Sequence, residues 1–241
     1  MAGFRTHITT STILGVGYGA TGYSLGMPWE TSLLATGLCS VSGMLPDLDS
    51  DSGVPVREMF SFSAAVIPLL MIDRFEHLHM SQELMVLVGG LIYLFVRFIV
   101  ARWFKQYTVH RGMWHSIPAA LVALLLAFLI CSCEDIYLRA FKSFAVFLGF
   151  VSHLVLDEIY SFEIRQGKLR IKNSFGTALK FWSKKGLWPN VSTYGKLLIL
   201  VGIAVGDPWL MNHWEEPSHD VPHTAQQWLN DLLEERDRLF R

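Results

Sequence analysis

The stretch Val109-His110-Arg111-Gly112-Met113-Trp114-His115-Ser116 stands directly before a long apolar run over residues 117–133. Two imidazoles therefore lie five residues apart, around a glycine, at the edge of a segment suited to a membrane interior. An ionisable side chain at such a position is unfavourable unless it pairs or binds something. The stretch predicts a membrane helix with a polar site at its end.

Two further stretches of the same chemical kind border other apolar runs. They are Leu45-Pro46-Asp47-Leu48-Asp49 and His153-Leu154-Val155-Leu156-Asp157. Histidines and aspartates at the ends of several membrane segments together indicate a metal site, since imidazole and carboxylate groups are both common ligands of divalent ions.

The composition agrees with a membrane protein. Of the 241 residues, 51% are hydrophobic and only 17% are charged, whereas soluble domains usually carry about a quarter charged residues. The net charge of −1 carries no nucleic-acid signature. We therefore expect no nucleic acid among the partners, and membrane lipids instead.

Apolar runs recur along nearly the whole chain and predict an all-α fold, a polytopic helical membrane bundle. The third run is short and contains Pro68, so it is either a span or a re-entrant segment. Glycines in the first run favour close helix packing in lipid. We expect about seven membrane segments, over residues 8–26, 31–46, 60–73, 84–101, 117–133, 141–157 and 196–211.

Parity makes this assignment testable. If all seven segments span, the loops over residues 1–7, 47–59, 102–116 and 158–195 lie on one side of the membrane, and all three polar stretches share one face. If residues 60–73 do not cross, the Asp47 and His110 loops fall on opposite sides. Thirteen of the 20 lysines and arginines belong to the shared side, counting Lys196 directly after the last of these loops, so the positive-inside rule predicts that the site faces the cytoplasm.

Two pieces lie outside this pattern. An insertion at residues 161–195 contains alternating apolar and basic residues around Gln166-Gly167, which is typical of a small hairpin. Residues 212–241 form a polar linker followed by an amphipathic tail helix that begins near Thr224. The bundle itself occupies residues 1–211.

Each polar stretch has a simpler interpretation beside the metal site. His153 and Asp157, four residues apart on one helix face, either share an ion or form a hydrogen-bonded pair. Asp47 and Asp49 are carboxylate ligands or parts of a polar turn. His110 and His115 are ligands or satisfied interface residues. Ser116 is a candidate cap for the helix that follows it.

Three other groups remain open in the same way. His7 precedes the first segment at the depth of the other ligands, or is simply a solvated terminal residue. Arg111 contacts an anionic substrate group or a lipid headgroup. A rival metal cluster, or a solvated linker, is formed by His213, Glu215, Glu216, His219, Asp220 and His223; parity places it on the opposite face.

At these residues the chain resembles the YdjM-type family of bacterial inner-membrane-bound, metal-dependent hydrolases. The resemblance rests on Thr6-His7 and on the three polar stretches, which occur in that order over roughly the first 160 residues. It departs from the family pattern where the basic hairpin delays the stretch Gly186-Leu187-Trp188-Pro189.

The resemblance implies a helical membrane hydrolase distantly similar to zinc-dependent phospholipases C and single-strand nucleases. It implies one to three divalent ions, zinc in first place and manganese or magnesium as alternatives. The ligand candidates are His7, Asp47, Asp49, His110, His115, His153 and Asp157. Asp49 or Glu158 would accept a proton from the attacking water as catalytic groups, and Arg111 would bind the substrate phosphate.

We therefore expect a membrane-bound metal-dependent hydrolase that acts on a phosphoester, either a lipid or another membrane-associated molecule. Two alternatives belong to other classes. A metal-ion or proton transporter would need polar residues through the bilayer core, where segments 84–101 and 117–133 offer little besides Arg97. A structural membrane protein would use its metal only to staple helices.

Overall fold

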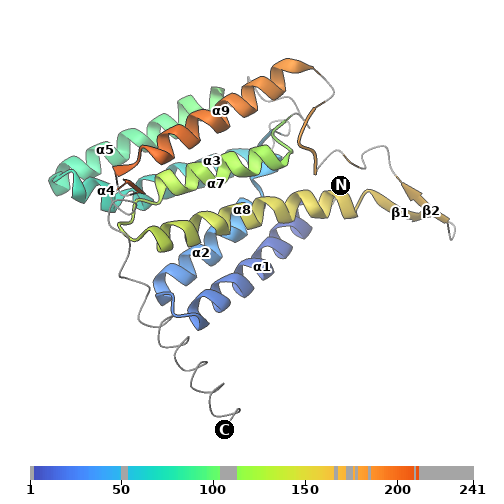
Figure 1. Cartoon of the computed structure of the whole chain (residues 1–241), viewed down its shortest axis with the longest axis horizontal. Coiled ribbons are helices and arrows are strands. Elements are labelled where there is room, and N and C mark those ends of the chain that lie inside the picture. The colour runs from blue at the N-terminus through green and yellow to red at the C-terminus, as the bar shows by residue number, and fades with distance from the viewer. Residues whose placement is uncertain are drawn as a thin grey trace, which may run out of the picture.

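The computed structural model describes residues 3–49, 54–103, 113–165, 168–171, 176, 179–183, 186–208 and 210–211. Helices dominate this part of the chain (Figure 1). Their order is α1 (Phe4–Ser24), α2 (Trp29–Ser42), the 3-10 helix η1 (Leu45–Asp49), α3 (Val54–Leu70), α4 (Ile72–His77), α5 (Gln82–Leu94), the π-helix η2 (Phe95–Val100), α7 (Ile117–Ile130), α8 (Ile136–Ile159), β1 (Phe162–Arg165), β2 (Lys168–Ile171) and α9 (Leu187–Val205).

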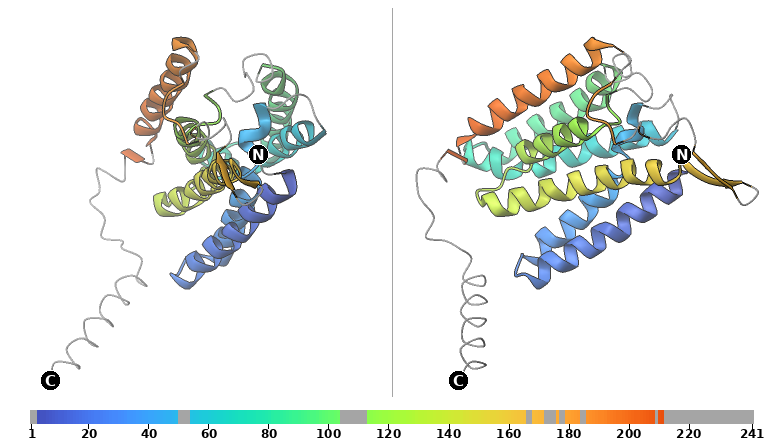
Figure 2. Two further views of the ribbon diagram at one scale, coloured as in Figure 1. Left: turned by 90° about the vertical axis from the view of Figure 1, so that its right-hand side faces the viewer. Right: turned by 45° about the vertical axis from the view of Figure 1, so that its right-hand side comes forward.

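Helix α8 lies at the centre of the bundle. Figures 1 and 2 show α1 and α2 on one side of it, and α7 with α3, α5 and α9 on the other. The α7–α8 interface is made of small residues on α7 against large ones on α8: Ala119, Ala120 and Ala123 pack against Val146, Phe150 and Leu154. Small side chains let the two backbones approach closely.

Glycines bring α1, α2 and α8 together. A Cβ built on Gly15 would lie 2.7 Å from the carbonyl oxygen of Thr36, so the glycine that the sequence places in the first segment is required by the approach of α2. Gly149 of α8 meets the carbonyl of Cys39 in the same way. The Tyr18 hydroxyl donates to the carbonyl oxygen of Phe141 at 3.0 Å and ties α1 to α8.

Helix α7 begins as the sequence predicts. The Ser116 hydroxyl accepts the backbone N–H of Ala119, and proline follows in the first turn, where backbone donors have no partner within the helix. The predicted basic hairpin is also confirmed: β1 and β2 pair antiparallel, with Phe162 opposite Ile171 and Arg165 opposite Lys168. It projects beyond the end of α8 (Figure 2).

A buried ion cluster closes the end of the bundle away from the hairpin. Asp207, just after α9, accepts from Arg139 of α8 at 3.0 Å and from Arg74 of α4 at 3.0 Å. The Arg139 side chain is fully buried, donates to the carbonyl of Phe128 and lies over its ring. The sequence analysis did not single out this cluster, because its three residues are far apart in the chain.

All seven apolar segments coincide with helices, although some bounds differ. The last helix begins at Leu187 rather than near residue 196, since Pro189 is compatible with a first turn. The segment with Pro68 is helical, as α3 followed by α4. The tail helix expected from Thr224 lies outside the described residues.

Two helices among the described residues are long and apolar enough to cross a membrane, Gln82–Trp103 and Ile136–Ile159. The first, α5 continued through η2, has almost no buried residue, and Val86, Leu87 and Leu91 are each about two-thirds exposed or more. A helix that is apolar all round and yet is not buried in protein suits lipid and not water. Helices α2 and α7 have 14 residues each, or about 21 Å, which is less than the hydrocarbon thickness of about 30 Å.

Candidate metal centre

Five of the seven predicted ligands meet at one end of the bundle. His7 lies in the first turn of α1, Asp47 in η1, His115 directly before α7, and His153 and Asp157 in the last turns of α8. These elements converge at the end from which the hairpin projects (Figure 1). The convergence agrees with the parity argument, which put all the loops that carry them on one side.

The packing of α2 against α8 orients His153. Its Nδ1 lies 2.7 Å from the carbonyl oxygen of Gly43, so Nδ1 carries the proton that this carbonyl accepts, and the lone pair is left on Nε2. Such a second contact fixes the tautomer of metal-binding histidines. The close approach depends on Gly149, one turn before His153, where a side chain would collide with α2.

Trp114 holds His115 beside Asp47. Its indole Nε1–H donates to the carbonyl oxygen of Leu45 at 2.8 Å, and its ring packs edge-on against Phe150. This hydrogen bond fastens the loop before α7 to η1. His115, next to Trp114 in the chain, therefore faces Asp47, two residues after Leu45.

The candidate ligand atoms form two overlapping groups. His7, His153 and Asp157 make one, and Asp47, His115 and His153 the other; within each group all ligating atoms lie within 4.8 Å of one another. The Nε2 of His153 is 3.5 Å from Asp47 Oδ1 and 3.8 Å from Asp157 Oδ2. The Nε2 of His7 is 3.4 Å from Asp157 Oδ1, and that of His115 is 3.8 Å from Asp47 Oδ1.

These separations are longer than ordinary N–H···O hydrogen bonds, which measure about 2.7–3.2 Å. Two ligand atoms that are each about 2.0–2.1 Å from a tetrahedral zinc ion lie roughly 3.4 Å apart. Among the described residues, His7 Nδ1, His153 Nε2 and Asp157 Oδ1 are buried with no hydrogen-bond partner. Buried polar atoms normally have one, so this donor set fits a divalent cation.

Burial is nearly complete except at Asp47. The side chains of His7, His115 and His153 are at most 2% exposed, and that of Asp157 is 6% exposed, whereas that of Asp47 is 30% exposed. Burial alone raises the pKa of Asp47, but the contact with His115 and the charges of the neighbouring imidazoles outweigh it and hold the pKa below its usual range. Asp47 is therefore an anion at neutral pH, at the open side of the cluster.

The ring geometry adds a constraint. His7 and His153 stack with their ring centroids 3.6 Å apart and their planes only 12° from parallel. An imidazole nitrogen binds an ion in the plane of its ring, so two stacked rings serve two neighbouring positions better than a single one. His115 meets His153 edge-on, at an interplanar angle of 67°.

Among the other predicted site residues, only the side chain of Glu158 is described, and it is not part of this cluster. The Glu158 carboxylate accepts the backbone N–H of Gly176 and belongs to neither ligand group. The backbone of Asp49 lies in η1, but its side chain is outside the described part of the chain. His110, Arg111 and the rival cluster over residues 213–223 also lie outside the described residues.

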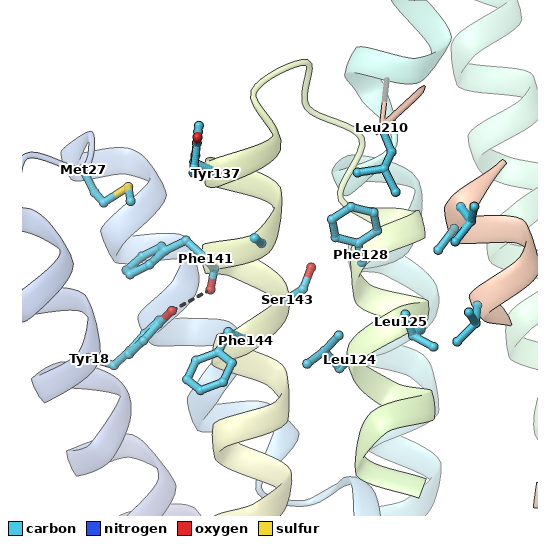
Figure 3. Close-up of a pocket in the computed structure, with 14 residues that line it drawn as sticks. Tyr18, Met27, Leu124, Leu125, Phe128, Tyr137, Phe141, Ser143, Phe144 and Leu210 are labelled. Atoms are coloured by element: carbon cyan, nitrogen blue, oxygen red, sulfur yellow. Dashed lines mark hydrogen bonds between the residues drawn. The ribbon is translucent and has the colours of Figure 1, made fainter. Parts of the chain in front are cut away.

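An apolar cavity of the described residues lies elsewhere in the bundle. This cavity, of about 670 Å³, opens between α1, α7, α8 and α9 and is lined mainly by Phe, Leu, Val and Ala side chains, Phe128, Phe141 and Phe144 among them (Figure 3). None of the five converging ligands lines it, so this cavity is not a substrate pocket of the cluster.

Gly43 and Trp114 position the cluster, although no sequence pattern predicted that role for either residue. Trp114 stands between two predicted ligands, yet nothing in the sequence pairs it with Leu45. The role of Gly43 belongs to its backbone carbonyl, for which the sequence carries no signal.

An apolar helical bundle with buried histidines and aspartates gathered at one end defines a class: helical membrane proteins with a polar centre at the ends of their helices. Within this class, the chain belongs to the YdjM inner membrane protein family, whose model matches residues 1–167. This range holds all seven predicted ligands. No curated protein and no solved structure matches the chain.

Proposed function

We propose that this protein is a metal-dependent hydrolase that cleaves a phosphoester at the surface of the inner membrane. The observation that carries the proposal is the separation of its buried nitrogen and oxygen atoms, 3.4–3.8 Å, which is longer than an ordinary hydrogen bond and suits ligands of a shared ion. Three imidazoles and two carboxylates favour zinc over magnesium, which prefers oxygen ligands.

The arrangement supports two ion positions. Asp157 directs Oδ1 toward His7 and Oδ2 toward His153, as a bridging carboxylate does, and the two rings that it faces are stacked. With centroids 3.6 Å apart, these two rings would hold two neighbouring ions, one on each ring, and such paired ions are common in enzymes that cleave phosphoesters. Asp47 and His115 would complete the ligands around the His153 position, and His110 and Asp49 are our candidates for further ligands at the His7 position.

A bound ion supplies Lewis acidity, which polarises a phosphoryl oxygen and lowers the pKa of an adjacent water. The residues do the rest. Asp157 and His153 fix the centre from one rigid helix, and Asp47 marks the side from which substrate enters, because it alone is appreciably exposed among the five. Asp49, two residues beyond Asp47, is our candidate to accept the water's proton, ahead of Glu158, whose carboxylate is engaged by the Gly176 N–H. Arg111 is our candidate for the phosphate contact.

We further propose a seven-segment topology with the centre facing the cytoplasm. All seven segments are helical, and the predicted ligands from three different loops lie at one end of the bundle. The excess of lysine and arginine in these loops supports the orientation.

Metal content and turnover together test the proposal. We expect purified protein to hold about two zinc ions, and to hydrolyse bis(p-nitrophenyl) phosphate, a soluble phosphodiester, with a loss on chelation that added zinc reverses. His115→Ala should reduce both metal content and turnover. His77→Ala, an exposed histidine on α4, is the matched control and should change neither.

Two outcomes would overturn the proposal. Wild-type protein that holds no stoichiometric ion after reconstitution with zinc would exclude a metal centre. Bound metal without turnover of any phosphoester, combined with a lower unfolding temperature on chelation, would assign the ion a purely structural role.

A further inference from the structure

Four large apolar side chains are exposed beside the start of α9. Phe181, Trp182, Leu187 and Trp188, which we call the apolar rim, are 63%, 54%, 72% and 77% exposed. They lie at the same end of the bundle as the metal centre, where the chain enters α9 (Figure 2). An exposed apolar group of this size marks an interaction surface in a native protein.

The rim is built on a defined frame. The buried Asn190 side chain accepts the backbone N–H of Ser183 at 2.7 Å and donates to the carbonyls of Ser183 and Gly186. The Tyr194 hydroxyl donates to the carbonyl of Phe181 at 2.7 Å, and its ring packs near that of Trp182. Hydrogen bonds from α9 therefore fix the backbone that carries the rim.

The same frame is joined to the metal centre. The backbone N–H of Ile117 donates to the carbonyl oxygen of Lys180 at 3.2 Å. Ile117 opens α7 and stands two residues after His115, one of the converging ligands. The rim thus has a fixed position relative to the site.

The surroundings of the rim indicate what covers it. The face of α9 that follows is also apolar and exposed, with Leu198 and Ile199 among its residues, so the rim continues a lipid-facing surface up to the helix end. The hairpin at the same end carries Arg165, Lys168 and Arg170. Tryptophan at the membrane interface and basic residues beside it are the combination that suits a leaflet with anionic headgroups.

We propose that the apolar rim inserts into the headgroup region of an anionic leaflet and holds the opening at Asp47 at the depth of the lipid phosphates. The substrate class is then a phosphoester within a membrane lipid, presented by the bilayer itself. This inference rests on the proposed hydrolase function for its substrate, but the insertion of the rim can be measured without any activity.

The first experiment measures depth. Trp188→Cys is made in a Cys133→Ser background, because the other two cysteines, Cys39 and Cys131, are buried. The protein is spin-labelled and reconstituted in vesicles of phosphatidylglycerol and phosphatidylcholine. We expect the label at position 188 to be relaxed more by oxygen than by a water-soluble nickel complex, and a label at the exposed position 179, at the loop side of the rim, to show a smaller ratio. Greater access of nickel than of oxygen at position 188 would overturn the proposal.

The second experiment compares two phosphodiesters. We expect Trp182→Ser/Trp188→Ser to keep turnover of bis(p-nitrophenyl) phosphate within about twofold of wild type and to lower hydrolysis of phosphatidylglycerol in vesicles at least tenfold. Trp29→Ser, an equally exposed tryptophan at the start of α2, is the matched control and should affect neither substrate.

The outcomes separate the two proposals. Equal loss of both substrates, or undiminished hydrolysis of the lipid, would overturn the role of the rim while leaving the hydrolase in place. A wild-type protein that cleaves neither substrate would contradict the proposed function, and the spin-label measurement would then decide on insertion of the rim alone.

Discussion

At the scale of single residues, His153 is the centre of the candidate site. Its Nε2 faces both aspartates, and its Nδ1 contacts the carbonyl of Gly43. The ring is fully buried, and the contact of Nδ1 fixes its orientation. The two ligand groups have only this residue in common.

We expect Asp157→Ala to abolish both ion positions, and His7→Ala to leave one. Asp157 faces both His7 and His153, so its loss weakens both positions, whereas His7 belongs to only one of them. Elemental analysis of the purified variants after dialysis should give about two ions per chain for wild type, about one for His7→Ala and none for Asp157→Ala. Equal metal content in the two variants would contradict the two-position arrangement.

At the scale of elements, the site depends on how closely α8 approaches α2. A methyl group on Gly149 would collide with the carbonyl of Cys39 and with Ser42, both on α2 and both close to Gly43 in the chain. A shift of α2 would withdraw the Gly43 carbonyl from His153.

Gly149→Ala is accordingly expected to lower the unfolding temperature and to reduce zinc affinity, since strain from overfilling a packed interface is about 1–3 kcal/mol. Gly17→Ala is the matched control, because no atom lies within 4 Å of a Cβ built there. It should be neutral or stabilising by up to about 1 kcal/mol. Thermal unfolding in detergent and zinc titration measure both effects; two variants with the same behaviour would refute the packing argument.

A second prediction at this scale concerns the ion cluster at the other end. Asp207→Ala removes the carboxylate shared by Arg139 and Arg74, to which the fully buried guanidinium of Arg139 donates two hydrogen bonds. Breaking a buried ion pair in this way is destabilising by about 3–5 kcal/mol, or an unfolding temperature lower by about 10 °C. Metal content should be unchanged in the variant protein that folds, because the cluster lies at the opposite end.

Glu58→Ala is the control for this variant. Its pair with Arg57 is more than 60% exposed on both sides, and such pairs contribute at most about 1 kcal/mol. A small loss for both variants would show that α4, α8 and α9 are held together without the buried charges.

The sequence predicted the elements better than their assembly. The apolar runs located all seven helical segments, and Ser116 with Pro118 located the start of α7, because capping and hydrophobic runs are local signals. The convergence of His7, Asp47 and His153 could be predicted only through parity, which counts helix ends. The contacts that give the cluster its geometry, from Trp114 to Leu45 and from His153 to Gly43, join residues far apart in the chain, and residue types alone do not specify such pairs.

At the scale of the whole molecule, the number of membrane crossings decides on which side of the membrane each end of the bundle lies. The decisive element is α3, whose 17 residues span about 26 Å, somewhat less than a typical hydrocarbon core. If α3 with α4 crosses, residues before α3 and after α4 lie on opposite sides. If α3 with α4 does not cross, the loops that carry Asp47 and His115 fall on opposite sides of the membrane. The two side chains could then meet only if one of these loops lay inside the bilayer.

We expect α3 with α4 to cross. Single cysteines placed by Arg57→Cys and Glu76→Cys, both at exposed positions, in the Cys133→Ser background should react from opposite sides with a membrane-impermeant maleimide. Position 76 should label in spheroplasts, together with Glu134→Cys in the loop between α7 and α8, and position 57 only in inverted membrane vesicles, together with Leu179→Cys. Labelling of positions 57 and 76 from the same side would remove the crossing, and with it the cytoplasmic location that the 13 basic residues of the shared side predict. If positions 57 and 76 are labelled from opposite sides but position 57 reacts in spheroplasts, the seven-segment bundle is kept and its orientation is reversed. The centre would then face the periplasm.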